Sequence, residues 1–145
     1  MLFDTHLHLI YPDILRYLWL DKVDLLNKPS RYEDYHIKAS RLGISACLHM
    51  EVDVQENQIK EETKMIYNLI NNNDTIIKGV ISSCRPEKSN FSEMIEYAGA
   101  QPLIKGFRRV LHVVPDNTAE SDQFKANINL LSDTKLTFDL CALPH

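Results

Sequence analysis

The sequence predicts an α/β protein built on a parallel β-sheet. Short apolar runs with little alternation are typical of strands that are covered on both faces, as in a parallel sheet. Longer segments between them carry apolar residues at three- and four-residue steps, which is the pattern of amphipathic helices. Because strands and helices alternate along the chain, the pattern favours repeated βα units.

Five runs are predicted to be strands, because each is apolar and too short for a core helix. In chain order these runs are Leu2–Leu7, Ile44–Met50, Ile76–Ser82, Leu103–Leu111 and Leu136–Cys141. The segment between the first strand and Pro29 is the least regular part of the chain and is too long for a tight βα turn. We therefore expect it to be a long loop, and long loops often carry function.

Four segments are predicted to be helices: Ser30–Leu42, Val54–Asn72, Ser92–Ala100 and Ala119–Leu131. The first closes on Gly43, a residue suited to a helix C-terminus. The second has the clearest pattern, because Ile59, Ile66 and Ile70 recur at helical spacing with charged residues between them. The asparagines and the aspartate that follow residue 70 are expected to end it.

Composition and net charge exclude several classes of protein and of binding partner. The chain has 145 residues, 44% of them hydrophobic and 25% charged, which is typical of one globular domain over residues 1–145 and excludes a disordered or disulfide-stapled chain. Its net charge of −4 gives no general basic field for nucleic acid or an anionic membrane. We expect neither class of partner.

The compartment is predicted from the first residues and the cysteines. Charged residues and a proline interrupt the apolar N-terminal segment, so neither a signal peptide nor a membrane span is expected. Cys47, Cys84 and Cys141 are widely spaced and form no C-x-x-C motif. Reduced cysteines and a cytoplasmic location are the expectation.

The motif most indicative of chemistry is Asp4-Thr5-His6-Leu7-His8 at the end of the first predicted strand. Side chains two residues apart on a strand share a face, so His6 and His8 point the same way. Two such imidazoles can bind one metal ion through nitrogens about 2.0–2.1 Å from zinc. The alternative is a pair of histidines that are merely solvated or satisfied by backbone groups.

The motif and its context resemble the amidohydrolase superfamily, whose barrels open with D-x-H-x-H. Three further segments resemble its amidohydrolase-related branch, which includes fuconolactonase-like and 2-pyrone-4,6-dicarboxylate lactonase-like hydrolases. They are Leu48-His49-Met50-Glu51, Gly106-Phe107-Arg108-Arg109 and Phe138-Asp139-Leu140-Cys141. The resemblance spans nearly the whole chain, and only D-x-H-x-H is specific to the superfamily.

The resemblance implies a partial TIM-like (β/α)8 barrel of about five βα units, with strands in the order 1-2-3-4-5 and the site at their carboxyl ends. His6 and His8 would be catalytic and would bind a divalent metal, with zinc the first choice, that activates water. Some members of the branch work without metal and use these histidines to polarise the carbonyl or contact substrate, so both mechanisms stay open. No organic cofactor is expected.

Further residues are expected to bind the substrate, a small carboxylate-bearing lactone. Arg108 and Arg109 lie on opposite faces of a strand, and the one at the barrel mouth would grip the carboxylate, unless it forms a structural salt bridge. His49 and Glu51 share a face and could orient a histidine, or Glu51 could approach the metal; a solvated strand end is the alternative. His145 resembles the polar end of strand five.

The chain departs from the family in supplying five of eight strands. The strand-six histidine and the strand-eight aspartate that acts as general base have no counterpart here, so we expect little or no turnover. A partial barrel has open sheet edges that must be accommodated. We expect one of three cases: the natural protein continues past His145, the chain self-associates through those edges, or it is a poorly stable remnant.

One alternative belongs to a different class, a complete five-stranded flavodoxin-like binding module without catalysis. Its length fits, but the chain has only four glycines and no Gly-rich phosphate loop after the first strand. The strand order decides between the two, because such a module has the order 2-1-3-4-5.

Overall fold

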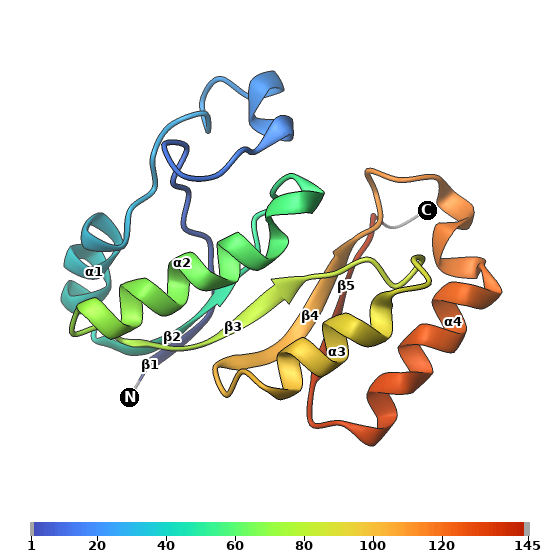
Figure 1. The fold of residues 1–145 in the computed structure, drawn as a ribbon. Helices are drawn as coiled ribbons and strands as arrows, with labels where there is room; N and C mark the ends of the chain where they lie inside the picture. The colour runs from blue at the N-terminus through green and yellow to red at the C-terminus, as the bar shows by residue number, and fades with distance from the viewer. Residues whose placement is uncertain (1, 144–145) are drawn as a thin grey trace. The chain divides into compact units, whose positions relative to one another are not determined.

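The computed structural model describes residues 2–143, and strands and helices alternate along them (Figure 1). The strands are β1 (Leu2–Leu7), β2 (Ile44–Met50), β3 (Ile77–Ser83), β4 (Ile104–Val110) and β5 (Thr137–Cys141). The α-helices are α1 (Tyr32–Arg41), α2 (Ile59–Asn72), α3 (Phe91–Gly99) and α4 (Asp122–Asn129). Short 3-10 helices are η1 (Leu18–Lys22), η2 (Glu56–Gln58), η3 (Asp116–Glu120) and η4 (Leu130–Asp133).

The five strands form one sheet in the order β1-β2-β3-β4-β5. The outer pairs, β1 with β2 and β4 with β5, are parallel. Sequential order is that of a barrel built from successive βα units, so the prediction of a partial TIM-like barrel is confirmed. The order 2-1-3-4-5 is absent from this sheet, and the flavodoxin-like alternative is therefore wrong.

Two of the predicted helices differ from the observed ones by more than two residues at an end. The helix predicted to begin at Val54 begins at Ile59, after η2. Val54 is a loop residue, and its apolar side chain is buried in the core with 2% of its surface exposed. The segment predicted as one helix over Ala119–Leu131 is divided into the end of η3, α4 and the start of η4. At the division, the Ser121 hydroxyl accepts a hydrogen bond from the Phe124 amide at 3.3 Å and caps α4.

The chain divides into two compact units, residues 1–80 and 81–145. In the first, Leu7 and Leu9 of the β1 segment and Cys47 of β2 pack with Ile66 of α2. Tyrosine hydroxyls tie the long loop to this core. The Tyr11 hydroxyl accepts a hydrogen bond from the Tyr32 amide at 3.1 Å.

The second unit has its own core, in which Phe107 of β4 meets Phe91 of α3 with ring centroids 5.7 Å apart. Its α4 is anchored by Asn127, whose side-chain amide donates to the carbonyls of Pro86 and Lys88 at 2.8 and 2.7 Å. Among residues 2–143, no helix is long and apolar enough to cross a membrane.

Candidate functional site

His6 and His8 lie side by side at the carboxyl end of β1. Their Nε2 atoms are 3.1 Å apart, and their rings are nearly perpendicular, at 85°. His6 is exposed and His8 is half-buried, whereas Leu7 and Leu9 point into the core. Alternation along the extended chain therefore places the two imidazoles together on the side away from that core.

A hydrogen bond to the neighbouring strand fixes the orientation of His8. Its Nδ1 lies 3.0 Å from the carbonyl oxygen of Met50, at the end of β2. A backbone carbonyl only accepts, so His8 donates from Nδ1, and the Nε2 lone pair of the neutral ring is directed toward His6. This is the arrangement in which a histidine ligand is held by an outer partner while its other nitrogen meets a metal.

Asp4, the first residue of the motif, shapes the strand that carries the two histidines. Its Oδ1 accepts a hydrogen bond from the His6 amide at 3.0 Å, within an irregular stretch of the β1–β2 register. Its Oδ2 accepts one from the Tyr35 hydroxyl of α1 at 2.9 Å. Burial, and then this hydrogen bond, raise the pKa of Tyr35 well above its usual range. The sequence pattern assigns no separate role to Asp4 and does not reveal Tyr35.

The donor set fits a divalent metal. A tetrahedral zinc ion places two of its nitrogens roughly 3.3 Å apart, and the two Nε2 atoms are separated by 3.1 Å. Within the described part of the chain, no cluster of three or more His, Cys, Asp or Glu side chains could hold a metal ion. His6 and His8 would therefore supply two ligands, and the remaining positions would belong to other donors.

Cys47 lies in β2 opposite Asp4. Its burial predicts that the stability of the protein falls at alkaline pH. Burial raises the pKa of its thiol from 9.0 to about 11. The stabilisation from the buried neutral thiol is fully present below pH 9 and is lost as the pH rises toward 11. We expect the free energy of unfolding to fall by on the order of 1–2 kcal/mol more in the wild type than in Cys47→Ala over this window. Urea unfolding at pH 8.5 and 11 measures the difference, and equal losses in the two proteins would contradict it.

His49 and Glu51, expected near the substrate, are both buried at the end of β2. Their exposed fractions are 0% and 1%, so the alternative of a solvated strand end is wrong. His49 faces α2, where its Nε2 lies 3.3 Å from Oε1 of Glu62. Glu51 accepts a hydrogen bond from the Asp53 amide at 2.8 Å, and Asp53 has a positive φ of 46°. Glu62 was missed, because its helical position looks like any charged residue between apolar ones.

The two arginines of β4 point to opposite faces, as alternation predicts. Arg109 is 4% exposed and forms a two-pronged ion pair with Glu87, at 2.5 and 3.2 Å, which is the structural salt bridge left open from the sequence. Arg108 faces the other way, and its Nη2 lies 3.1 Å from Sγ of Cys141 in β5. Of the two guanidiniums, that of Arg108 is the one not committed to Glu87. His145 lies outside the described residues.

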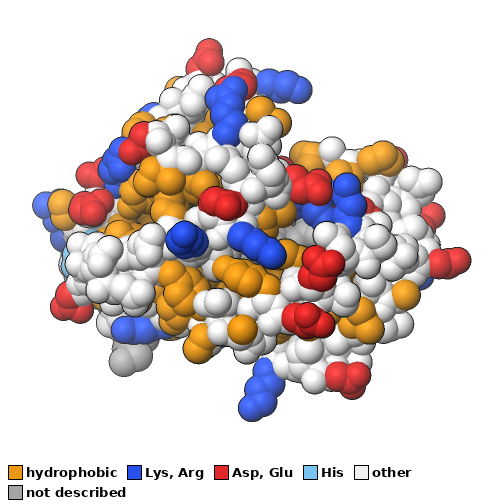
Figure 2. Space-filling model, viewed as in Figure 1, with side chains coloured by type: hydrophobic (Ala, Val, Ile, Leu, Met, Phe, Trp, Pro, Cys, Tyr) orange, Lys and Arg blue, Asp and Glu red, His pale blue; other side chains and the backbone are white. Residues whose placement is uncertain are grey.

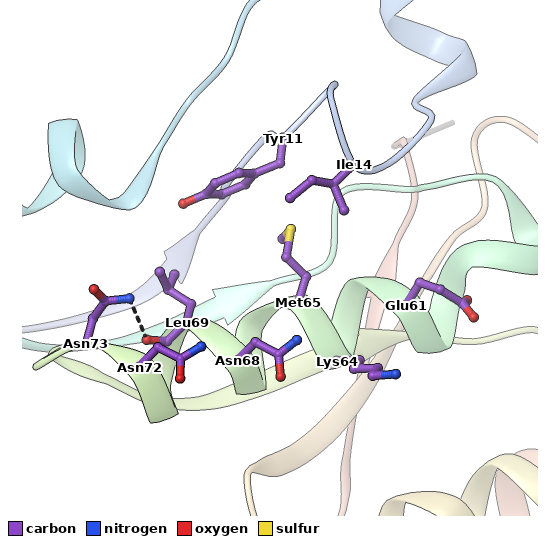
Figure 3. Close-up of a pocket in the computed structure, with 9 residues that line it drawn as sticks. All are labelled: Tyr11, Ile14, Glu61, Lys64, Met65, Asn68, Leu69, Asn72 and Asn73. Atoms are coloured by element: carbon purple, nitrogen blue, oxygen red, sulfur yellow. Dashed lines mark hydrogen bonds between the residues drawn. The ribbon is translucent and has the colours of Figure 1, made fainter.

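A groove of about 380 Å³ runs beside α2. Tyr11 and Ile14 of the long loop face Met65 and Leu69 of the helix across it (Figure 3). Figure 2 shows hydrophobic side chains gathered along this part of the surface. Neither histidine of the pair lines the groove, so it forms no part of the candidate site.

Comparison with known proteins shows the fold. No protein-family model and no curated protein matches the chain. Among solved structures, an amidohydrolase 2 from Bifidobacterium longum subsp. infantis is 20% identical over 96% of this chain and 50% of its own, with a TM-score of 0.70. An amidohydrolase from Burkholderia multivorans with bound zinc is 15% identical over 97% and 49%, with a TM-score of 0.76.

A third structure is a probable 2-pyrone-4,6-dicarboxylic acid hydrolase from Acinetobacter baumannii with citric acid bound. It is 10% identical over 97% of this chain and 49% of its own, with a TM-score of 0.65. The chain thus spans about half the length of the solved structures it matches. At these identities the likeness shows that the chain has the fold of the corresponding part of an amidohydrolase.

Proposed function

We propose that the chain supplies the first five βα units of an amidohydrolase-related hydrolase, with His6 and His8 as ligands of a divalent metal. The observation that carries the proposal is the 3.1 Å separation of the Nε2 atoms of His6 and His8, together with the Met50 carbonyl that orients the His8 ring. The zinc bound in the Burkholderia amidohydrolase supports it. When bound, such an ion polarises a carbonyl and lowers the pKa of water.

The proposed substrate class is a lactone or similar cyclic ester that carries a carboxylate. Hydrolysis adds water across the acyl carbon–oxygen bond and leaves a carboxylate and a hydroxyl group. Arg108 suits the carboxylate, because a guanidinium fork can donate two parallel hydrogen bonds to its oxygens. The description of the Acinetobacter structure as a probable pyrone dicarboxylic acid hydrolase supports this class.

A metal-free mechanism for the same pair is the second candidate. His8 donates from Nδ1 to Met50, so protonation of its Nε2 would let both imidazoles donate toward a lactone carbonyl. Hydrogen-bond donors aimed at the oxygen stabilise the charge that develops on it as water attacks. Activity that persists in a chelator and disappears with the histidines would favour this candidate.

We expect the 145-residue chain on its own to show little or no lactone hydrolysis. No residue here corresponds to the late aspartate of the family, and loss of a general base costs typically 10²–10⁴-fold. The measurement is hydrolysis of 2-pyrone-4,6-dicarboxylate with added Zn²⁺, by the chain and by the His6→Ala, His8→Ala double variant. Robust turnover that the double variant abolishes would overturn the expectation of inactivity and establish the histidine pair as catalytic.

Substrate recognition can be tested apart from turnover. We expect the dicarboxylate to bind weakly, with roughly tenfold loss in Arg108→Ala, as for removal of one charged hydrogen-bonding group. Lys105→Ala, which removes an exposed cation from the same strand, is the matched control and should bind as the wild type does. Equal binding by all three proteins would contradict the role of Arg108.

We also propose self-association through the outer strands. β1 and β5 are the edges of the sheet, and Phe3 and Leu140 on them are 47% and 58% exposed. Unpaired strand edges with exposed apolar side chains favour pairing between chains. Light scattering should show a mass that rises with concentration, and Phe3→Lys should reduce it. A monomer at all concentrations would exclude this partner.

A further inference from the structure

Glu62 is a buried carboxylate on α2 that the proposed chemistry does not use. Its side chain is 2% exposed, although its neighbours Glu61 and Lys64 on the same helix are exposed. Burying a carboxylate is costly unless hydrogen bonds compensate for the lost water. The contacts of Glu62 therefore show what the helix gains by keeping an acidic side chain in the protein interior.

Two polar contacts of Glu62 lead to the end of β2. Its Oε1 accepts a hydrogen bond from the Val52 amide at 2.9 Å and lies 3.3 Å from Nε2 of His49. The Nδ1 atom of His49 is buried and has no hydrogen-bond partner among the described residues. His49 is therefore held by polar contact through Glu62, with its Nε2 donating to the carboxylate.

Glu62 contacts His49 and Val52. In the sequence these two residues lie on either side of Met50, whose carbonyl orients His8. Between them lies Met50, whose carbonyl oxygen is 3.0 Å from Nδ1 of His8. A second anchor acts on the same turn, because the indole Nε1 of Trp19 donates to the Val52 carbonyl at 2.9 Å. All of these residues belong to the first compact unit.

We propose that Glu62 is a positioning residue for His8. By fixing His49 on one side of Met50 and the Val52 amide on the other, its carboxylate holds the Met50 carbonyl where His8 Nδ1 donates to it. The Nε2 atom of His8 then faces that of His6. The expected effect on metal binding rests on the proposed function. The effect on the orientation of His8 does not, because His8 contacts Met50 without a metal.

The test separates a positioning role from a merely structural one by reading the tautomer of His8. Glu62→Met keeps the volume of the side chain and removes both hydrogen bonds. Glu62→Gln retains an oxygen that accepts from Val52 and His49. Glu61→Ala removes an exposed carboxylate from the same helix and is the matched control. Long-range ¹H–¹⁵N NMR reports which ring nitrogen of His8 carries the proton, and calorimetry with Zn²⁺ reports affinity.

We expect the Nδ1–H tautomer of His8 in the wild type, in Glu62→Gln and in Glu61→Ala. In Glu62→Met the Nε2–H tautomer should appear, and Zn²⁺ affinity should fall about 10–100-fold, the usual loss when a ligand no longer has the hydrogen bond that orients it. A folded Glu62→Met with the tautomer of the wild type would overturn the proposal. So would a Glu62→Gln protein that changes as much as Glu62→Met.

Trp19→Phe keeps the proposal testable if Glu62→Met does not fold. It removes only the indole hydrogen bond to the Val52 carbonyl, on the other side of the same turn, and a smaller shift toward the Nε2–H tautomer is expected. An unchanged tautomer there would count against the proposal. If the wild type has the Nδ1–H tautomer and binds no Zn²⁺, the proposed function fails and the positioning role stands.

Discussion

His8→Ala is expected to weaken Zn²⁺ binding at least 100-fold, and His6→Ala to have a similar effect. Each substitution removes one of the two nitrogens that lie 3.1 Å apart, and a single imidazole on a strand end has no chelate partner. Calorimetric titration at pH 7.5 measures the affinity.

The matched control is His112→Ala, which removes an exposed histidine outside the pair. It should bind Zn²⁺ as the wild type does. Circular dichroism of each variant shows whether the fold is retained, and retention is expected because His6 is exposed and His8 half-buried. Unchanged affinity in folded His8→Ala would mean that zinc binds elsewhere on the chain.

Gly106→Ala is expected to destabilise the fold strongly. Gly106 of β4 lies opposite Thr137 of β5, and an added Cβ would come within 2.6 Å of the Thr137 carbonyl oxygen and closer still to its side-chain oxygen. A carbonyl held in a strand cannot move away without breaking the β4–β5 ladder. We expect a loss of about 2–4 kcal/mol in the free energy of unfolding.

Gly99→Ala is the control for this substitution. It lies at the end of α3, and an added Cβ there would meet no atom within 4 Å. Replacing a helical glycine by alanine stabilises by roughly 0.5–1 kcal/mol. Urea unfolding of both variants measures the contrast, and a Gly106→Ala protein as stable as Gly99→Ala would show that the β4–β5 approach is looser than described.

The strands were predictable because their signal is local. A short apolar run is visible in the sequence itself, and Leu2–Leu7 and Ile44–Met50 were predicted with the observed bounds. Coverage on both faces was predicted too, but most side chains of the edge strand β1 are exposed. Val54 misled the prediction of α2, because an apolar residue in a buried turn has the same composition as one on a helix face. The strand order followed from the family resemblance, since periodicity carries no information about which strands are neighbours.

The candidate site was predictable only in part. The H-x-H spacing alone places His6 and His8 on one face. The residues around them come from far away in the sequence: Met50 contacts His8, Tyr35 contacts Asp4, and Glu62 contacts Val52. These polar contacts depend on how α1, α2 and β2 pack. No sequence pattern distinguishes a buried Glu62 from its exposed neighbours.

The most direct test of the central claim is a Zn²⁺ titration of the wild type followed by the ¹⁵N resonances of the histidine rings. The account predicts that the Nε2 resonances of His6 and His8 shift together and saturate at one equivalent, while those of His36, His49 and His112 stay in place. Zinc that shifts neither His6 nor His8, or only one of them, would contradict a shared metal site on β1.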